Sequence, residues 1–217
     1  RDMKRLAIFD FDGTLFDSIH DVLICFNKAL AIHDFSPLTR EELIPCLGGN
    51  IDEIVALVLN ENNTEKNVEE VKRTYLDLYY SSDKELTVPF PKAHDLLRKL
   101  QDDGVILAIN SNRLSDSLEH FVSRFFSDID FVMVEGHNSK DPSKPHPCGV
   151  LKIIEKAGVL KEETIYIGDS STDILTAKNA GIDCVIVRWG YGNRKDWEDD
   201  YPVKVVDEME ELLELGG

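Results

Sequence analysis

An α/β fold, with a parallel sheet covered by helices on both faces, is predicted by three features of the sequence. Short segments rich in Val and Ile alternate along the chain with segments of helical periodicity. The strand segments are apolar almost throughout, which is typical of strands buried on both faces. Glycines follow three of the helical segments, where a left-handed residue commonly ends a helix. Together these features favour a Rossmann-like arrangement of strands and helices.

The first predicted strand, residues 6–9, is followed by a long helical block. Apolar residues at helical spacing follow N-cap candidates at Asp17 or Ser18 and at Asn50, and a further amphipathic set spans residues 68–78. No strand is predicted within this block. The sequence therefore predicts an α/β domain with one helical interruption.

After this block, strands and helices alternate to the end of the chain. The later strands are expected at 105–109, 131–134, 164–167, 184–187 and 203–206. The helices between and after them are expected at 93–100, 118–125, 150–157, 174–180 and 209–215. In parallel sheets of this kind, ligands bind at the carboxyl ends of the strands.

The overall composition restricts the class of partner. The chain has 217 residues, 42% of them hydrophobic, with a formal net charge of −17 and a pI of about 4.7. Nucleic-acid binding requires a basic surface, and docking on anionic lipid does as well, so we expect neither partner. The sequence contains no apolar run of membrane-spanning length, and we predict no signal peptide. An anionic substrate stays compatible with this charge if the site carries its own cations.

The four cysteines are scattered along the chain, at Cys25, Cys46, Cys148 and Cys184. They form no C-x-x-C pair, so neither a disulfide framework nor a zinc site is indicated. A reducing, cytoplasmic environment is therefore expected. The sequence leaves the oligomeric state open.

Polar residues that could carry chemistry gather where the predicted strands end. They are Asp10 and Asp12, then Asn110, Ser111 and Asn112, then Lys144, and finally Asp169, Ser170 and Asp173. Oxygen ligands of this kind suit a hard cation, most naturally Mg²⁺, which proteins usually share with a substrate phosphate. Ser111, nearby backbone N–H groups and Lys144 are suitable donors to phosphate oxygens.

Each of these residues also has an ordinary structural explanation. Ser111 and Asp173 alone are typical helix caps, Lys144 alone is typical of a solvated surface, and residues 168–170 alone are typical of a turn. The functional interpretation depends on all four groups falling at strand ends of one sheet.

Four segments of the chain resemble the signatures of the haloacid dehalogenase superfamily, in the same order. Asp10-Phe11-Asp12-Gly13-Thr14-Leu15 resembles the first signature, and Ser111 after an apolar strand resembles the second. Lys144 in Lys144-Pro145-His146-Pro147 resembles the third signature, and Gly168-Asp169-Ser170-Ser171-Thr172-Asp173 resembles the fourth.

Asp17-Ser18 and the helical block resemble the phosphoglycolate phosphatase branch of that superfamily. This resemblance implies an α/β core domain at residues 1–16 and 89–217, with an inserted helical cap domain at 17–88. It also implies a Mg²⁺-dependent phosphomonoester hydrolase that acts on a small phosphorylated metabolite.

The resemblance implies a role for each matched residue. Asp10 would attack phosphorus and form an aspartyl-phosphate, while Asp12 would protonate the leaving oxygen and then activate water. Mg²⁺ would be held by the Asp10 side chain, the Asp12 backbone carbonyl and Asp169, with Asp173 either a direct ligand or a partner of one. Lys144, Ser111 and the backbone N–H of Asn112 would bind the phosphoryl group.

The substrate is less well defined. Gly48, Gly49 and Asn50 resemble the substrate-contacting cap loop of related phosphatases, and the alternative is an ordinary turn between helices. His20 and Arg113 could reach the site, but the favoured interpretation of each is a solvated side chain. Phosphoglycolate, sugar phosphates, nucleoside monophosphates and pyrophosphate all stay open as substrates.

Two other functions remain as alternatives. A mutase resembling β-phosphoglucomutase would share all four signatures, but the cap arginine expected of such a mutase has no counterpart in residues 48–50. A non-catalytic binding domain would be expected to have lost Asp10 or Asp12, and both are present.

Overall fold

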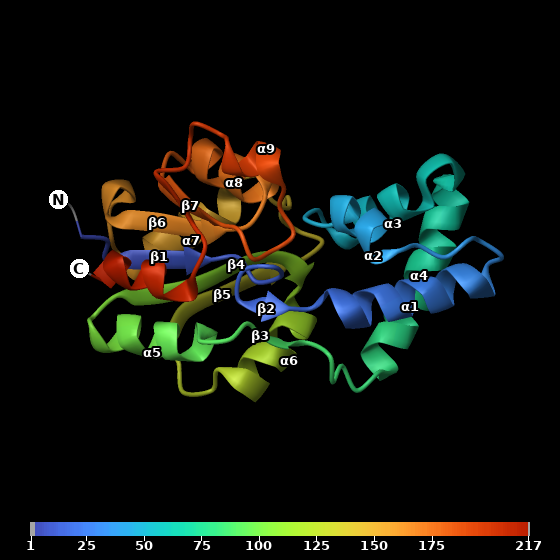
Figure 1. Cartoon of the computed structure of the whole chain (residues 1–217), viewed down its shortest axis with the longest axis horizontal. Helices are drawn as coiled ribbons and strands as arrows, with labels where there is room; N and C mark the ends of the chain where they lie inside the picture. Colours follow the sequence, from blue (N-terminus) through green and yellow to red (C-terminus); the bar gives the residue numbers. More distant parts are fainter. Residues whose placement is uncertain (1–2, 217) are drawn as a thin grey trace. The chain divides into compact units, whose positions relative to one another are not determined.

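The computed structural model describes residues 3–216, and Figure 1 shows its helices and strands. The chain forms two compact units, Arg1–Phe16 with Pro89–Gly217, and Asp17–Val88. It passes between them twice, in the short strands β2 (Phe16–Asp17) and β3 (Val88–Pro89), which pair in a two-stranded sheet.

The larger unit contains a six-stranded sheet in which every neighbouring pair is parallel. In spatial order the strands are β5 (Phe131–His137), β4 (Ile106–Leu114), β1 (Leu6–Phe9), β6 (Thr164–Gly168), β7 (Asp183–Val187) and β8 (Lys204–Val206). All four residues of β1 are fully buried, which explains why its sequence is apolar on both faces. The predicted fold class is therefore confirmed.

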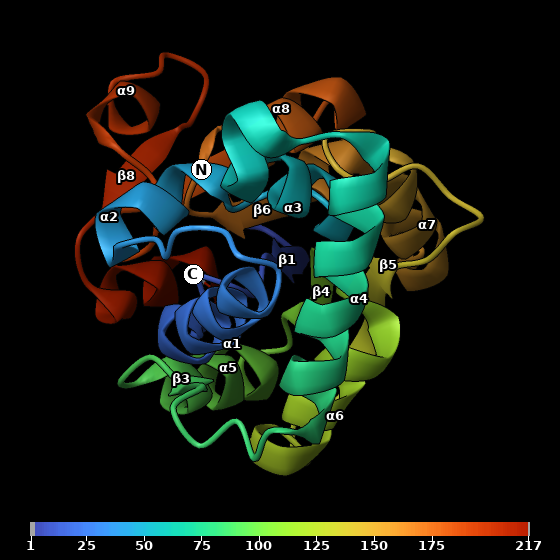
Figure 2. The same cartoon turned by 90° about the vertical axis from the view of Figure 1, so that its right-hand side faces the viewer.

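Helices cover both faces of this sheet (Figures 1 and 2). The larger unit contains α5 (Ala93–Asp102), α6 (Ser115–Phe125), α7 (Cys148–Ala157), η3 (Lys161–Glu163), α8 (Ser171–Ala180), α9 (Arg194–Trp197) and η4 (Met209–Gly216). One buried core packs Leu6 and Ile8 of β1 against Val150 of α7 and Ile174 of α8. Helices α5 and α6 lie on the opposite face, as right-handed connections between parallel strands require.

An aromatic cluster lies next to the end of β1. The rings of Phe11 and Phe16 stack with centroids 4.2 Å apart, and Phe121 of α6 lies 6.0 Å from Phe11 and 5.7 Å from Phe16. Aromatic pairs of this geometry add stability beyond the area they bury. The cluster fixes the segment that carries Asp10 and Asp12.

The smaller unit is helical apart from its two connecting strands. Its helices are α1 (Ile19–Ile32), α2 (Arg40–Leu43), η1 (Ile44–Cys46), α3 (Ile51–Leu59), η2 (Asn60–Asn62) and α4 (Glu65–Ser81). The rings of Phe26 on α1 and Tyr75 on α4 stack at 3.8 Å, so the apolar faces of these two helices bury each other.

Several details differ from the sequence-based expectations. Strand β4 continues through Asn110, Ser111 and Asn112, which were expected just after it. The expected final helix is the 3-10 helix η4, and the short helix α9 was not anticipated. Ser18 is the N-cap of α1, but its side chain makes no capping hydrogen bond. In residues 3–216, no helix combines the length and the apolar character needed to cross a membrane.

Candidate active site

The parallel register brings the ends of β1 and β6 together beside the middle of β4. Phe9 at the end of β1 lies opposite Ile109 of β4 and Ile167 of β6. The backbone N–H of Asp10 donates to the carbonyl of Ile167 at 2.8 Å, so Asp10 continues the ladder by one residue. The side chains that follow these strands therefore converge on a single site.

Three carboxylates are buried at this edge. Asp10, Asp169 and Asp173 are 8%, 3% and 1% exposed, and each offers an oxygen within 4.8 Å of the other two. Asp173, in the first turn of α8, accepts hydrogen bonds from the backbone N–H groups of Asp169 at 2.9 Å and Ser170 at 3.3 Å. Asp173 is thus the third helical residue of a capping box whose N-cap is Ser170, and it also faces the site with its other oxygen.

Two glycines make this close packing sterically possible. A Cβ at Gly168 would lie 2.2 Å from the carboxyl carbon of Asp173, and a Cβ at Gly13 would lie 2.1 Å from an oxygen of Asp169. Gly13 also has a φ of +80°, which other residues rarely adopt. Any side chain at either position would displace a carboxylate of the cluster.

Lys144 supplies the cation that faces the buried carboxylates. Its Nζ donates to Asp10 Oδ1 and Asp173 Oδ1, both at 3.0 Å, to the hydroxyl of Tyr166 at 2.9 Å and to the carbonyl of Asn110 at 3.2 Å. The Lys144 side chain is 5% exposed, so this ammonium is held almost entirely by protein groups. The surface interpretation of Lys144 does not apply in this fold.

The side chain of Asn112 holds the backbone of Lys144. Asn112 Oδ1 accepts from the Lys144 N–H at 2.8 Å, and Asn112 Nδ2 donates to the Lys144 carbonyl at 3.1 Å. Asn112 therefore links β4 to the loop before α7, and its side-chain amide is used for this link.

The electrostatics follow from this burial. Burial, reinforced by the Asp173 carboxylate, raises the pKa of Asp10 to about 7, although Lys144 opposes the shift. Burial also raises the pKa of Asp169 well above its usual range. For Asp173, burial is outweighed by the contacts with Lys144, and its pKa is lowered. Lys144 pairs with two of the three carboxylates, so ionisation of all three would leave surplus negative charge at the site.

Asp12 lies apart from the other three carboxylates and is paired with Arg113. Arg113 Nη2 donates to Asp12 Oδ1 at 2.6 Å, and Arg113 Nε donates to Asp12 Oδ2 at 3.2 Å. The Arg113 side chain is only 10% exposed. The interpretation of Arg113 as a solvated side chain is therefore wrong, because its guanidinium is buried against the Asp12 carboxylate. His20, by contrast, is exposed on α1.

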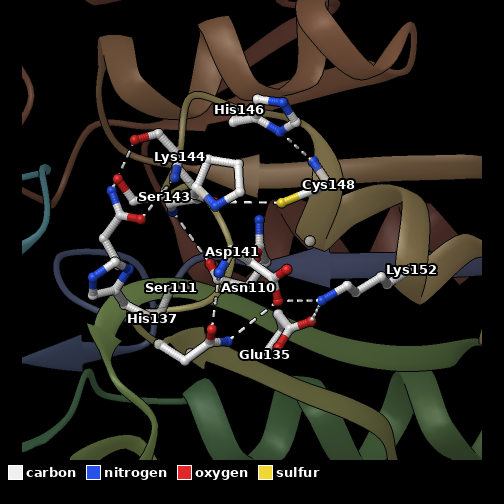
Figure 3. A pocket seen from close by; sticks show the side chains of 15 residues that line it. Asn110, Ser111, Glu135, His137, Asp141, Ser143, Lys144, His146, Cys148 and Lys152 are labelled. Atoms are coloured by element: carbon white, nitrogen blue, oxygen red, sulfur yellow. Dashed lines mark hydrogen bonds and ion pairs between the residues drawn. The ribbon is translucent and has the colours of Figure 1, made fainter.

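Ser111 is buried in β4, where its hydroxyl accepts from the backbone N–H of Arg113 at 3.0 Å. It is not a helix cap. Ser111, Asn112 and Lys144 line a pocket of about 330 Å³, part of which is open to solvent. Figure 3 shows Ser111 and Lys144 in this pocket, together with Lys152, which pairs with Asp141 and Glu135.

Gly48, Gly49 and Asn50 lie in the helical unit, just before α3. Asn50 Oδ1 accepts from the backbone N–H of Glu53 at 3.0 Å, and Glu53 Oε1 accepts from the Asn50 N–H at 2.9 Å. This reciprocal pair is a capping box, so Asn50 has a structural role at the start of α3. A role for these three residues in specificity stays a prediction.

Tyr166 is a residue of the site that was not predicted from the sequence, and Arg113 was expected to be solvated. Tyr166 is completely buried in β6, and its hydroxyl contacts both Lys144 Nζ and the Asn110 carbonyl, the latter at 3.3 Å. A signal was present in the sequence, because a tyrosine in an otherwise apolar buried strand needs a partner for its hydroxyl.

The chain belongs to the family of haloacid dehalogenase-like hydrolases, whose model matches residues 7–187. Its relatives include a phosphoglycolate phosphatase of Vibrio parahaemolyticus, 28% identical over 99% of this chain and 96% of the relative. A phosphoglycolate phosphatase of Pseudomonas fluorescens strain Pf-5 is 28% identical, over 97% of this chain and 79% of its own length. These findings confirm the predicted family and the predicted class of enzyme, a phosphatase.

A solved structure shows that the fold of the whole chain has a counterpart in another protein. A protein from Lactobacillus delbrueckii subsp. bulgaricus superposes on this chain with a TM-score of 0.90 and 27% sequence identity, and the match covers 98% of each chain. The similarity therefore includes both compact units and not the sheet alone.

Proposed function

We propose that the chain is a Mg²⁺-dependent phosphomonoester hydrolase that forms an aspartyl-phosphate on Asp10. The observation that carries this proposal is the contact of Lys144 Nζ with Asp10 Oδ1 and Asp173 Oδ1 inside a buried group of three carboxylates. A carboxylate held in one orientation by a lysine is well suited to in-line attack on a phosphate. The phosphoglycolate phosphatases among its relatives make phosphoglycolate the first candidate substrate.

Each residue of the site has a distinct role in the proposed reaction. Lys144 holds the Asp10 carboxylate and reduces its repulsion of the incoming phosphate. Ser111 and the backbone N–H of Asn112 bind the phosphoryl oxygens. Asp12 gives a proton to the leaving oxygen and then takes one from the water that hydrolyses the aspartyl-phosphate.

The residues present fit a Mg²⁺ ion. Asp10, Asp169 and Asp173 offer only oxygen donors, and their mutual proximity leaves more negative charge than Lys144 alone offsets. We propose the Asp10 and Asp169 carboxylates and the Asp12 backbone carbonyl as ligands, with Asp173 a ligand or a partner of one. Bound Mg²⁺ would supply positive charge that lets two anions approach each other.

We also propose that residues 17–88 act as the cap domain and that Gly48, Gly49 and Asn50 contribute to the choice of substrate. A small phosphorylated metabolite is the expected partner.

A cytoplasmic location is proposed as well, supported by the four free cysteines, because thiols persist in a reducing compartment.

The decisive experiment measures phosphate release from a panel of phosphoglycolate, sugar phosphates, nucleoside monophosphates and pyrophosphate. Hydrolysis of at least one phosphomonoester with Mg²⁺ present is the expected result. Phosphate release from none of them would contradict the proposal and favour a binding domain. Isomerised product without phosphate release, or a requirement for a bisphosphate, would identify a mutase instead.

A further inference from the structure

The geometry of Asp12 and Arg113 assigns a role to the arginine. The two residues form a side-on bidentate pair, with Nη2 to Oδ1 at 2.6 Å and Nε to Oδ2 at 3.2 Å. Two hydrogen bonds between planar groups fix both the position and the rotation of a carboxylate. Asp12 therefore has a defined orientation although its side chain is 31% exposed.

Arg113 is itself held in place by groups other than Asp12. Its Nη1 donates to the hydroxyl of Ser117 at 3.0 Å. Its guanidinium carbon lies 5.5 Å from the ring centre of Phe11 and 5.2 Å from that of Phe121, within the range of cation–π contacts. A side chain held on several sides can act as a rigid support for its partner.

The site consequently contains two separate sets of cations and carboxylates. Lys144 contacts Asp10 and Asp173, whereas Arg113 contacts Asp12. Asp12 is only two residues from Asp10, and the negative charge of the buried cluster would otherwise repel it. Arg113 keeps the Asp12 carboxylate at a distinct position beside the cluster.

We propose that Arg113 is a positioning residue, which orients the Asp12 carboxylate for proton transfer at the leaving oxygen. This inference rests on the proposed function, since it takes Asp12 as the group that serves the leaving oxygen. An arginine is required because its planar fork makes both hydrogen bonds at once, whereas a lysine would supply the charge without fixing the rotation.

The test compares two kinds of substrate in four proteins. The proteins are the wild type, Arg113→Met, Asp12→Asn and the double variant. The substrates are p-nitrophenyl phosphate, whose leaving group departs without a proton, and a simple alkyl phosphate, whose leaving group needs one. The quantity compared is kcat/KM, which reports the steps up to departure of the leaving group.

Arg113→Met is expected to lower kcat/KM for the alkyl phosphate about 100-fold, the size of loss that misplacement of a catalytic group by about 1 Å can cause. The loss should be much smaller for p-nitrophenyl phosphate, and it should appear in kcat more than in KM. In the Asp12→Asn background, Arg113→Met should cause no further loss, because two residues that act through one group are not additive.

Three results would overturn the inference. Equal losses for both substrates would indicate a purely structural role for Arg113. A raised KM that persists in the Asp12→Asn background would indicate that Arg113 contacts the substrate directly. An Arg113→Met protein as active as the wild type on the alkyl phosphate would show that no positioning is needed.

Controls distinguish a failure of the role of Arg113 from a folding defect and from a failure of the proposed role of Asp12. Arg124→Met removes an arginine of α6 whose guanidinium lies over the ring of Phe125, and it should leave both activities unchanged. If Arg113→Met does not fold, Arg113→Lys replaces it and should show a smaller loss with the same substrate dependence. A Lys variant equal to the wild type would contradict the need for a fork. If Asp12→Asn itself leaves alkyl phosphate hydrolysis intact, the proposed role of Asp12 fails first.

Discussion

The Asp10 carboxylate lies beside those of Asp169 and Asp173 and pairs with Lys144. Substitution of Asp10 can therefore test its role in catalysis separately from its role in stability. Asp10→Asn keeps the size of the side chain but removes both the nucleophilic oxygen and one negative charge. We expect this variant to lose essentially all phosphatase activity. Its thermal unfolding temperature should stay close to that of the wild type, because Lys144 still pairs with Asp173 at 3.0 Å.

Phosphate release and a circular dichroism melt check this prediction together. Near-normal activity of Asp10→Asn would show that another residue is the nucleophile. Loss of activity with loss of the folded state would leave Asp10 with a structural role only.

The raised pKa of Asp10 also predicts how the stability of the metal-free protein depends on pH. Burial, with a contribution from Asp173, raises the pKa of Asp10 from 3.8 to about 7, so the folded protein retains a proton that the unfolded chain releases. The stability that this proton provides is complete below pH 3.8 and is lost as pH rises through about 7. Asp169 acts in the same direction, whereas the lowered pKa of Asp173 acts only below its ordinary value of 3.8.

Urea unfolding in EDTA at a series of pH values from about 5 to about 8 measures this dependence. The free energy of unfolding of the wild type should fall with rising pH more steeply than that of Asp10→Asn. Parallel curves for the two proteins would refute the assignment of the shift to Asp10.

At the level of elements, Asn50 at the start of α3 has two possible roles, as the N-cap of the helix and as a specificity residue. Two substitutions can distinguish them. Asn50 and Glu53 form a capping box, and loss of an N-cap side chain typically costs about 1 kcal/mol. We therefore expect Asn50→Ala to lower the free energy of unfolding by about that amount. Asn50→Ser, which can still cap the helix, should restore most of it.

Steady-state kinetics of the same two variants tests the predicted role in specificity. A KM that stays raised in Asn50→Ser, despite restored stability, would identify a contact between Asn50 and the substrate. An unchanged KM in both variants would remove Asn50 from the candidate specificity residues.

The strands and helices were largely predictable, and the differences have physical causes. Strand β1 and the helix stops at Gly158 and Gly181 follow from local signals, namely an apolar run and left-handed glycines. The end of β4 was not predictable from hydropathy, because Asn110 and Ser111 are polar yet pair with the neighbouring strand or lie buried beside it. Tertiary contacts determine whether polar residues at such a strand end belong to the strand or to the loop that follows.

At the level of the whole molecule, the sheet assembles a site from segments far apart in the sequence. Asp10, Lys144 and Asp173 come from three separate segments, and the carboxyl-edge rule for parallel strands predicted that they would meet. The rule does not identify the pairing of Arg113 with Asp12. That contact depends on the direction of the Arg113 side chain, which lies where the pairing of β4 with β5 is irregular and which packs against Ser117 and Phe121 of α6.

The surplus negative charge of the buried cluster predicts that a divalent cation stabilises the whole protein. Because three carboxylates face one ammonium group, Mg²⁺ should bind the folded state far more tightly than the unfolded chain. EDTA should therefore abolish phosphatase activity and lower the unfolding temperature, and added Mg²⁺ should restore both.

Asp169→Asn is the matched variant for this experiment, because it removes one carboxylate of the cluster and keeps its shape. Asp169 is 3% exposed and contacts the backbone N–H of Tyr191 at 2.8 Å, a hydrogen bond that an asparagine oxygen can still accept. The variant should fold, and its unfolding temperature should respond much less to Mg²⁺ than that of the wild type.

A wild-type protein that stays active after exhaustive chelation, with an unfolding temperature insensitive to Mg²⁺, would refute the metal site. An equal response of Asp169→Asn and the wild type to Mg²⁺ would mean that the ion binds elsewhere, since the cluster would then have lost a ligand without effect.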